Sequence, residues 1–385
     1  MKNAPCDWVD LDLRFRKSTV LPGIPADHPD WWTFWHAHLL GRAKPNWFYS
    51  ATTSPEWFSH HWPALTGRWI EAADEQLASP SHLAFRPEHL DNGDIDWGGN
   101  PTHSMTWAGF HYWGWANPLI RGYGVARNPH YATAFAGHLK AYFEQIDTFV
   151  PTLWEGADPN DRDWRDWITH NDLSAGIKMA TFAEAVMVFA REPLWTADDL
   201  RRATLIVLRL AERLYGTYQN ARTSMEVLMT YNFLTSGAAG LGVVAAIFPE
   251  CTWSSAWLAL ATRILEVHVM ELYYSDGGHK ELCTQYHQAG LRDILFFEQV
   301  LAAQGKSYFL TVEPYRAKLL TCLRWLTGIL MPDGTTSVLN SAAASTDWLI
   351  YCLVANKVLA DPELDYHLGQ WFSPAYIPRL KAIPA

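Results

Sequence analysis

Residues 196–214 read TADDLRRATLIVLRLAERL, and this stretch carries the pattern that recurs along most of the chain. Its apolar residues return every three or four positions, and arginines occupy the opposite side. Such spacing predicts an amphipathic helix that buries one face, with Thr196 or Asp198 capping its first turn. The predicted buried face consists of Leu200, Ala203, Val207, Ala211 and Leu214.

The same periodicity extends on both sides of this stretch. Asn128 and Pro129 supply an N-cap and a proline at the first helical position. Apolar residues then follow at helical spacing: Phe135, Leu139, Tyr142, Ile146 and Phe149. Asn171 can cap the next helix, whose apolar residues are Leu173, Ile177, Ala180 and Val188. Further helices are predicted at about 224–247, 253–273, 285–304, 312–330 and 345–360.

Strand signals are nearly absent, apart from a short piece at 335–339. No repeat of the TPR or ankyrin type occurs, and no Pro/Gly/Ser-rich linker divides the chain. The sequence therefore predicts an all-α fold with one continuous domain over residues 101–385. Residues 1–100, rich in Trp and Pro, are predicted to form an irregular part of short helices and loops that packs on it. An irregular bundle and an α/α toroid both fit this pattern.

Composition narrows the class of protein. The 385 residues are 49% hydrophobic and 18% charged, which excludes a disordered chain. The formal net charge of −10 argues against general nucleic-acid binding, which needs basic surface. The 21 tryptophans are expected to fill the core for the most part, with a few lining a cleft where their flat rings could stack on sugars.

The five cysteines are widely spaced and form no C-x-x-C pair, so neither a zinc site nor a disulfide framework is predicted. The N-terminal residues lack the apolar region of a secretory signal. The most apolar stretch, residues 237–248, is too short to span a membrane. We therefore expect a cytoplasmic protein with no membrane contact, metal or cofactor.

The segment DGGHKELCTQYH, residues 276–287, is dense in titratable groups and lies between two predicted helices. His279, Glu281, Tyr286 and His287 could supply an acid, a base and an orienting group. Polar residues on a turn between core helices are a frequent location for function. The alternative is a helix-capping turn with a solvated histidine.

Two further segments carry polar groups. In TYNFLTSGAAGL, residues 230–241, Tyr231 and Asn232 precede a run of small residues. The alternative there is a tightly packed helix whose Asn bonds locally. In DIDWGGNP, residues 94–101, Asp94 and Asp96 form either a carboxylate pair or an Asp-stabilised turn. A Trp- and His-rich stretch with Trp107 and His111 follows.

In order and rough spacing, these three segments resemble the helical domain of the heparinase II/III-like polysaccharide lyases, which include oligoalginate lyases. The corresponding family stretches are similar to DGxHxEQSPxYH, NNHLIGEAAGL and IDWxxxP. A weaker match, MPDGTTSVLN at 331–340, resembles a PDGxxPLxGD stretch. The resemblance spans about residues 94–341. It implies an incomplete α/α toroid that performs β-elimination on uronate-containing glycans.

The resemblance also implies roles for individual residues. Asn232 matches the residue that neutralises the uronate carboxylate, Tyr286 matches the catalytic tyrosine, and His287 matches its neighbour in the motif. These three are the predicted catalytic residues. Asp96 belongs to a turn that lines the cleft. The predicted substrate-binding residues are His111, Tyr231, His279, Glu281, Trp97 and Trp107.

Several positions depart from the family pattern. Phe233 replaces a histidine, Gly237 a glutamate and Ser341 an aspartate, and Gly109-Phe110 stand where Asn-Arg is usual. We also expect the chain to lack the family's C-terminal β-sandwich. These changes predict a less polar cleft, and an apolar face left without the β-sandwich would favour a homodimer.

Three functions remain open at this level. The first is a lyase acting on a uronate oligosaccharide or a small carboxylated metabolite. The second is a non-catalytic toroid that binds a ligand or a partner chain. The third is another toroid enzyme, such as an inverting glycosidase, which would need two carboxyl groups flanking the bond. The carboxylates available for such a pair are Asp94, Asp96, Glu155 and Glu281.

Overall fold

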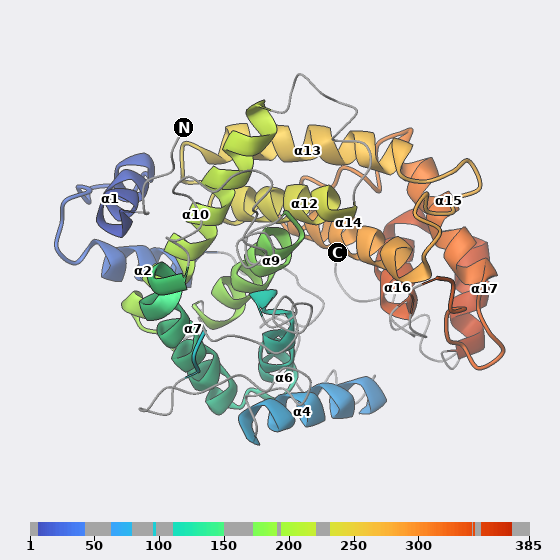
Figure 1. Ribbon diagram of the computed structural model, residues 1–385, viewed down its shortest axis with the longest axis horizontal. Helices are drawn as coiled ribbons and strands as arrows, with labels where there is room; N and C mark the ends of the chain where they lie inside the picture. Colours follow the sequence, from blue (N-terminus) through green and yellow to red (C-terminus); the bar gives the residue numbers. More distant parts are fainter. Residues whose placement is uncertain are drawn as a thin grey trace.

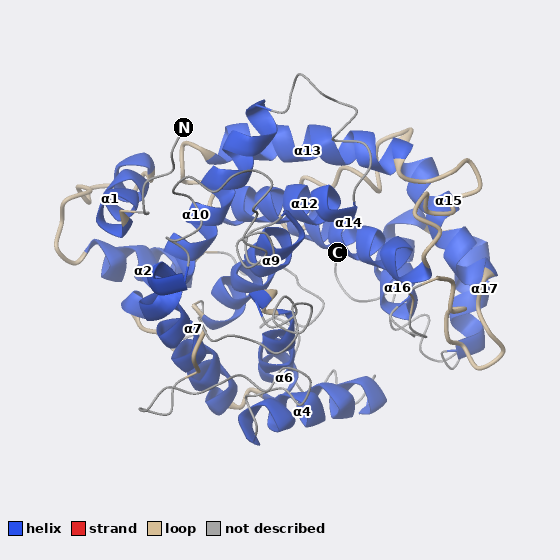
Figure 2. Ribbon diagram, viewed as in Figure 1, coloured by secondary structure: helices blue, strands red, loops and turns tan. Residues whose placement is uncertain are grey.

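The computed structural model describes residues 7–42, 63–78, 95–97, 111–149, 172–190, 194–220, 232–340, 342 and 348–371. In these ranges the regular structure is helical, with isolated β-bridges and no strand (Figure 2). The prediction of an all-α fold is confirmed. The helices follow an open arc from α4 through α7, α10 and α13 to α17 (Figure 1).

The helices and their bounds are as follows. The N-terminal region contains α1 (Trp8–Ser18), α2 (Trp31–Gly41) and α4 (Pro63–Ala78). The middle contains α6 (Asn117–Ala126), α7 (Pro129–Phe149), α9 (Asp172–Phe189) and α10 (Ala197–Asn220). The remainder contains α12 (Asn232–Ile247), α13 (Ser254–Glu271), α14 (Thr284–Ala302), α15 (Tyr315–Gly328), α16 (Trp348–Leu359) and α17 (Pro362–Trp371).

The periodic stretches of sequence form helices close to their predicted bounds. The predicted apolar face of α10 is buried from Leu200 to Leu214. Two helices depart from expectation: α17 was not predicted, and α4 is a 16-residue helix in a region expected to hold only short ones. The piece at 335–339 forms a single bridge between Leu330 and Thr336 instead of a strand.

Small residues bring the backbones of α9 and α12 into contact. A Cβ atom added to Gly176 would lie 2.1 Å from the carbonyl oxygen of Ser236. One added to Gly240 would lie 2.7 Å from the carbonyl oxygen of Gly176. Only glycine permits this approach. The small-residue run 236–240 therefore serves close helix packing, as one alternative from the sequence predicted.

The N-terminal helices pack on different parts of the arc. The carboxylate of Asp12 on α1 accepts hydrogen bonds from Trp32 Nε1 on α2 at 3.1 Å and from Arg201 Nε on α10 at 2.8 Å. The α4 helix instead packs on α6, where a Cβ atom on Gly122 would meet that of Ala73 at 2.5 Å. These contacts position α4 and α6 beside the pocket described below.

Tryptophan fills much of the core. The rings of Trp97 and Trp113 stack with centroids 5.0 Å apart, and Trp113 meets Phe182 edge-on at 4.6 Å. Both tryptophans are fully buried. None of the helices in the described ranges is long and apolar enough to cross a membrane.

Candidate active site

Helices α12 and α14 lie side by side and run in the same direction. The Ser236 hydroxyl donates a hydrogen bond to the carboxylate of Asp293. Two turns further along α12, a Cβ atom on Gly242 would lie 2.6 Å from the ring of Phe297. Because the contacts advance along both helices together, the first turns of α12 and α14 lie at the same end of the pair. These first turns carry Asn232 and Tyr286.

Asn232 is the first residue of α12 and is 7% exposed. Its backbone N–H donates to Glu281 Oε1 at 3.1 Å. The first N–H groups of a helix lack partners within the helix and carry partial positive charge, so a carboxylate is stabilising there. Burial raises the pKa of Glu281, and the Asn232 N–H opposes that shift. Glu281 therefore caps α12 and connects it to the polar turn before α14.

Tyr286 lies in the first turn of α14 and is 36% exposed. Asp293 is seven residues further on, so it shares the same helix face about 10 Å away. Tyr112 lies close enough to Tyr286 to be affected by it: burial, and secondly the charge on Tyr286, raise the pKa of Tyr112. The side chain of Tyr286 is thus partly exposed to solvent, with Tyr112 in its vicinity.

His279 and His287 are buried in the polar turn instead of solvated. The Nε2–H of His287 donates to the Cys322 carbonyl at 3.1 Å, and its ring stacks on Trp325 at 4.6 Å. The Tyr273 ring meets both histidines edge-on, at 5.1 and 5.3 Å. Burial lowers the pKa of His279 to about 4 and that of His287 to about 3. Both rings are neutral at pH 7.

His111 and Trp97 lie in the core on the other side of α9. Both are fully buried, and the Nε2–H of His111 donates to the Trp97 carbonyl at 3.1 Å. Burial, then the charge of Lys178, hold the pKa of His111 well below its usual range. Both side chains therefore pack in the core. That they contact substrate stays a prediction.

The remaining predicted site residues lie outside the described ranges. They are Tyr231 and Trp107, together with Asp94 and Glu155 of the glycosidase alternative and the positions of three family departures, Gly109, Phe110 and Ser341. Of the predicted set, the structure gathers Asn232, Glu281, His279, His287 and Tyr286 around the first turns of α12 and α14. It places Trp97 and His111 apart from them.

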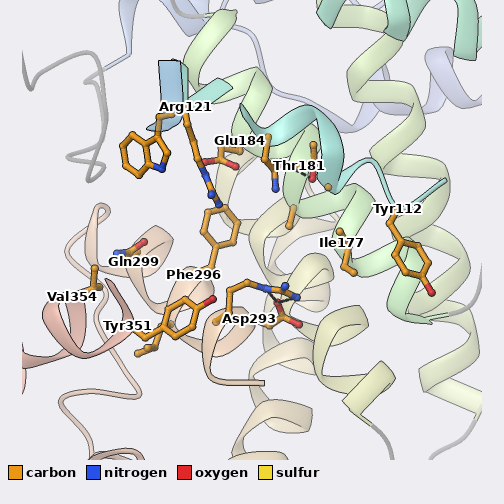
Figure 3. Close-up of a pocket in the computed structure, with 16 residues that line it drawn as sticks. Tyr112, Arg121, Ile177, Thr181, Glu184, Asp293, Phe296, Gln299, Tyr351 and Val354 are labelled. Atoms are coloured by element: carbon orange, nitrogen blue, oxygen red, sulfur yellow. Dashed lines mark hydrogen bonds and ion pairs between the residues drawn. The ribbon is translucent and has the colours of Figure 1, made fainter. Parts of the chain in front are cut away.

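A pocket of about 470 Å³ opens between α6, α9, α14 and α16 (Figure 3). Its lining residues are Trp69, Tyr112, Gly114, Asn117, Arg121, Ile177, Ala180, Thr181, Glu184, Arg292, Asp293, Leu295, Phe296, Gln299, Tyr351 and Val354. One lining residue, Tyr112, is also the residue whose pKa is raised in part by the charge on Tyr286. The volume lies in the range of small-molecule sites, which are largely apolar with a few placed polar groups.

The charged groups of the pocket were not predicted from the sequence. Arg292 donates a hydrogen bond from Nε to the carboxylate of Asp293 at 2.8 Å. The same carboxylate accepts a hydrogen bond from the Ser236 hydroxyl. Glu184 lies in the α9 wall, and burial raises its pKa to about 8. The sequence did contain a signal for Glu184. Apart from Asp172 in its first turn, α9 has only two charged residues, Lys178 and Glu184.

Comparisons with known proteins bear on this arrangement. The family model described as Heparinase II/III N-terminus matches residues 63–361. Among solved structures, a heparinase III superposes with a TM-score of 0.63 and 18% identity, covering 93% of this chain and 53% of that one. The heparinase III product of BT4657 gives a TM-score of 0.60 and 17% identity, covering 89% and 52%. No match was found among curated proteins.

A third solved structure, the heparan sulfate lyase HepC from Pedobacter heparinus, superposes with a TM-score of 0.54 and 18% identity, covering 88% of this chain and 50% of that one. The chain thus spans about half the length of these solved relatives. Likeness at this identity establishes the fold, and the arc of helices is an incomplete α/α toroid, as predicted. Because the family model covers most of its length, the chain belongs to the Heparinase II/III N-terminus family.

Proposed function

We propose that the protein is a lyase that performs β-elimination on a uronate oligosaccharide or a small carboxylated metabolite. In this reaction a base removes the proton on C5, and the electron pair of the C5–H bond forms the C4–C5 double bond. The C4–O bond breaks, and the leaving oxygen takes up a proton. The C5 proton is weakly acidic, so the adjacent carboxylate must first be neutralised to stabilise the enolate-like intermediate.

Asn232 would supply that neutralisation. It stands at the N-terminus of the 16-residue α12, where helix N–H groups and the helix dipole favour negative charge. Its side-chain amide can donate to a carboxylate oxygen. Glu281 fixes the first backbone N–H of the helix and so holds the residue in place.

Tyr286 would carry the proton. As a phenolate it can accept the proton from C5, and as the resulting phenol it can return that proton to the leaving oxygen. The side chain is exposed and stands at the same end of the α12–α14 pair as Asn232. This shared position is the observation that supports the proposal most strongly.

The buried histidines fit supporting roles in this scheme. His287 is held between Trp325 and the Cys322 carbonyl, directly after Tyr286 in the sequence. It would therefore act as a positioning residue, orienting the first turn of α14. His279 accepts a hydrogen bond from the Glu281 backbone N–H at 3.2 Å and would orient the carboxylate that caps α12.

A sugar panel with two variants tests the proposal. The substrates are oligoalginate, alginate, hyaluronan, chondroitin and heparan fragments, and the readout is ultraviolet absorbance of the new double bond. Absorbance should grow on at least one uronate substrate and vanish with Tyr286→Phe. Phe233→His restores the family's histidine, and a gain of cleavage on longer substrates would show that this departure sets specificity.

A non-catalytic toroid that binds a carbohydrate is the second candidate. The observation that favours it is the burial of His111, His279 and His287, which leaves no histidine of the predicted site at the surface among the described residues. It predicts saturable binding of uronate oligosaccharides without any ultraviolet product, and no effect of Tyr286→Phe on that binding.

A further inference from the structure

The carboxyl group of Glu184 lies in the pocket wall without a partner. The residue is 5% exposed and projects from α9. Its Oε1 atom is buried, and its side chain makes no hydrogen bond or ion pair with the residues that the structure describes. A buried polar atom without a partner costs stability. A ligand that bonds to this carboxyl group would remove that cost.

Two carboxamides of the same pocket also have hydrogen-bonding capacity left over. The Thr181 hydroxyl donates to Asn117 Oδ1 at 3.0 Å, and the Nδ2 hydrogens of Asn117 bond to no residue in the described ranges. The Gln299 amide lies in the α14 wall and makes no hydrogen bond with the described part of the chain. The pocket therefore offers a ligand two amide groups besides the carboxyl group of Glu184.

Aromatic rings line the pocket from three helices. Trp69 comes from α4, Phe296 from α14 and Tyr351 from α16. Phe296 and Gln299 are three residues apart on α14 and so share one face of that helix. Figure 3 shows the Phe296 ring in the centre of the pocket, with Glu184 above it and Tyr351 below. Polar groups and flat apolar surfaces thus alternate along the lining.

This combination suits a planar nitrogen heterocycle. Such a ring carries its hydrogen-bonding atoms in its plane and leaves its two faces apolar. Carboxyl and carboxamide side chains pair with the edge of a base through hydrogen bonds, and aromatic side chains stack on its faces. The volume of about 470 Å³ lies in the range of sites that enclose small molecules of this kind.

Burial decides which edge the carboxyl group can pair with. It raises the pKa of Glu184 to about 8, so the group is mostly protonated at pH 7. A neutral carboxyl group has an O–H donor and a C=O acceptor side by side. An edge of adenine presents the complement, because a ring nitrogen accepts and the adjacent amino group donates. An ionised carboxylate lacks the donor for this pairing.

We propose that the pocket binds the base of a purine compound, whose ring nitrogen and amino group pair with the Glu184 carboxyl group while Phe296 and the neighbouring rings contact its faces. The proposal does not depend on the lyase reaction, and neither Asn232 nor Tyr286 lines the pocket. Because the base is neutral, the arginines of the lining can keep any partners they have.

The pairing predicts a pH dependence of binding. If only protonated Glu184 pairs with the base, the apparent affinity follows the protonated fraction, which is about 0.9 at pH 7 and about 0.1 at pH 9. The affinity should therefore fall about tenfold between these two pH values.

Other titratable groups surround Glu184. The lining contributes Arg121 from α6, the Arg292–Asp293 ion pair from α14, Tyr351 from α16, and Tyr112. Arginines keep their charge between pH 7 and 9. On α9 itself, burial lowers the pKa of Lys178 to about 7, so this group loses its proton over the same range. Its Nζ donates to the Tyr142 hydroxyl at 2.8 Å, and Lys178 does not line the pocket.

Calorimetric titration of the whole chain with 9-methyladenine tests the site. The matched control ligand is its N6,N6-dimethyl derivative, which keeps the ring but has no amino hydrogen. At pH 7 the first ligand should bind saturably and at least about tenfold more tightly than the second. Its affinity should fall about tenfold by pH 9. Adenosine and adenosine monophosphate, titrated in parallel, distinguish a free base, a nucleoside and a nucleotide as the source of the base.

Three variants separate the carboxyl group from the rest of the pocket. Glu184→Leu occupies a similar volume without a hydrogen-bonding group and should lower the affinity about tenfold. Glu184→Gln keeps one donor and one acceptor, so it should bind 9-methyladenine at pH 7 and lose the pH dependence. Glu144→Gln, on the exposed face of α7, should match the unaltered chain at both pH values.

Three results would overturn the site: no saturable binding of 9-methyladenine at pH 7, equal binding of the dimethyl derivative, or unchanged affinity in a folded Glu184→Leu protein. If that variant does not fold, the two ligands on the unaltered chain decide the question alone. A tenfold fall that persists in Glu184→Gln would contradict the pairing and assign the pH dependence to Lys178. Binding is read as heat and elimination as ultraviolet absorbance, so each can fail without the other.

Discussion

The Glu281 carboxylate accepts a hydrogen bond from the backbone N–H of Asn232 at 3.1 Å, across 49 positions of sequence. This bond joins the polar turn before α14 to the first turn of α12. It brings Asn232 and Glu281, which lie in separate motifs of the sequence, to one end of a parallel helix pair. The two motifs thus meet at one candidate site.

Replacing Tyr286 by Phe should lower turnover by about 10²–10⁴, the range that general acid–base groups contribute. Only a hydroxyl on a partly exposed side chain is lost, so the thermal midpoint should stay unchanged. Steady-state rates on the best uronate substrate provide the measurement. Tyr366→Phe, on the exposed surface of α17, is the matched control and should retain full activity. Full activity in the Tyr286 variant would rule out its role.

Replacing Asn232 by Ala should lower kcat by about 10²–10³, the cost of losing one donor to a developing oxyanion. Asn232→Asp should cost at least as much, because it places a negative charge opposite the substrate carboxylate. Asn128→Ala is the control: it removes a hydrogen bond to the backbone N–H of His130, at the start of α7 and away from α12. A normal kcat with a raised KM would mean that Asn232 binds substrate without stabilising the intermediate.

Acid should destabilise the protein through its buried histidines. The unfolded chain binds protons at His279 and His287 near pH 6.5, whereas the folded chain binds them only near pH 4 and 3. Stability is therefore lost as the pH falls from about 6.5, by roughly 2 kcal/mol per histidine at pH 5. Urea unfolding at pH 7 and 5 measures this. The loss of unfolding free energy between pH 7 and 5 should be smaller in His287→Gln. It should be unchanged in His130→Gln, which replaces an exposed histidine.

Glu184 should make the protein less stable as the pH rises, whereas the buried histidines make it less stable as the pH falls. Its folded pKa of about 8 exceeds the ordinary value of 4.5, so its burial costs stability progressively as the pH rises from 4.5 to 8. Glu184→Gln should stabilise the protein by up to about 3 kcal/mol at pH 7 and by almost nothing at pH 4.5. The same unfolding series, with Glu144→Gln as control, provides the measurement. A constant difference at all pH values would show that Glu184 ionises normally in the folded protein.

The contact of α9 with α12 should be intolerant of any side chain at Gly176. Its Cβ atom would meet the Ser236 carbonyl at 2.1 Å, so Gly176→Ala should lower the free energy of unfolding by about 1–3 kcal/mol or more. Gly216→Ala on α10 has nothing within 4 Å of the added atom. It should instead raise stability by about 0.5–1 kcal/mol, because alanine favours helix. Equal effects of both changes would show that the two backbones do not touch.

Much of the fold could be predicted from sequence because each long helix carries its own 3.6-residue pattern. The prediction for α7 shows this, since Pro129 begins the helix and Phe135, Leu139 and Tyr142 are all fully buried. The helix α17 was missed because its ten residues make fewer than three turns, too short a run for the helical spacing of Leu364 and Leu368 to stand out. Trp97 shows a second limit, since a tryptophan at the predicted edge of a cleft packs entirely into the core.

The candidate site could be predicted only in part. The motifs identified Asn232 and Tyr286, which the structure places at one end of a helix pair. They could not show that His279 and His287 are buried, because burial depends on Tyr273, Trp325 and the rest of the fold. The pocket beside them is built from four distant helices, and no local pattern marks Arg121, Glu184 and Asp293 as neighbours.

Ultraviolet absorbance with short uronate oligosaccharides measures whether this chain forms unsaturated uronate. We predict absorbance growth that is saturable in substrate, is lost in Tyr286→Phe and is retained in Tyr366→Phe. Absence of growth on every uronate substrate, with a folded protein that still binds glucuronate, would contradict it and leave a carbohydrate-binding toroid.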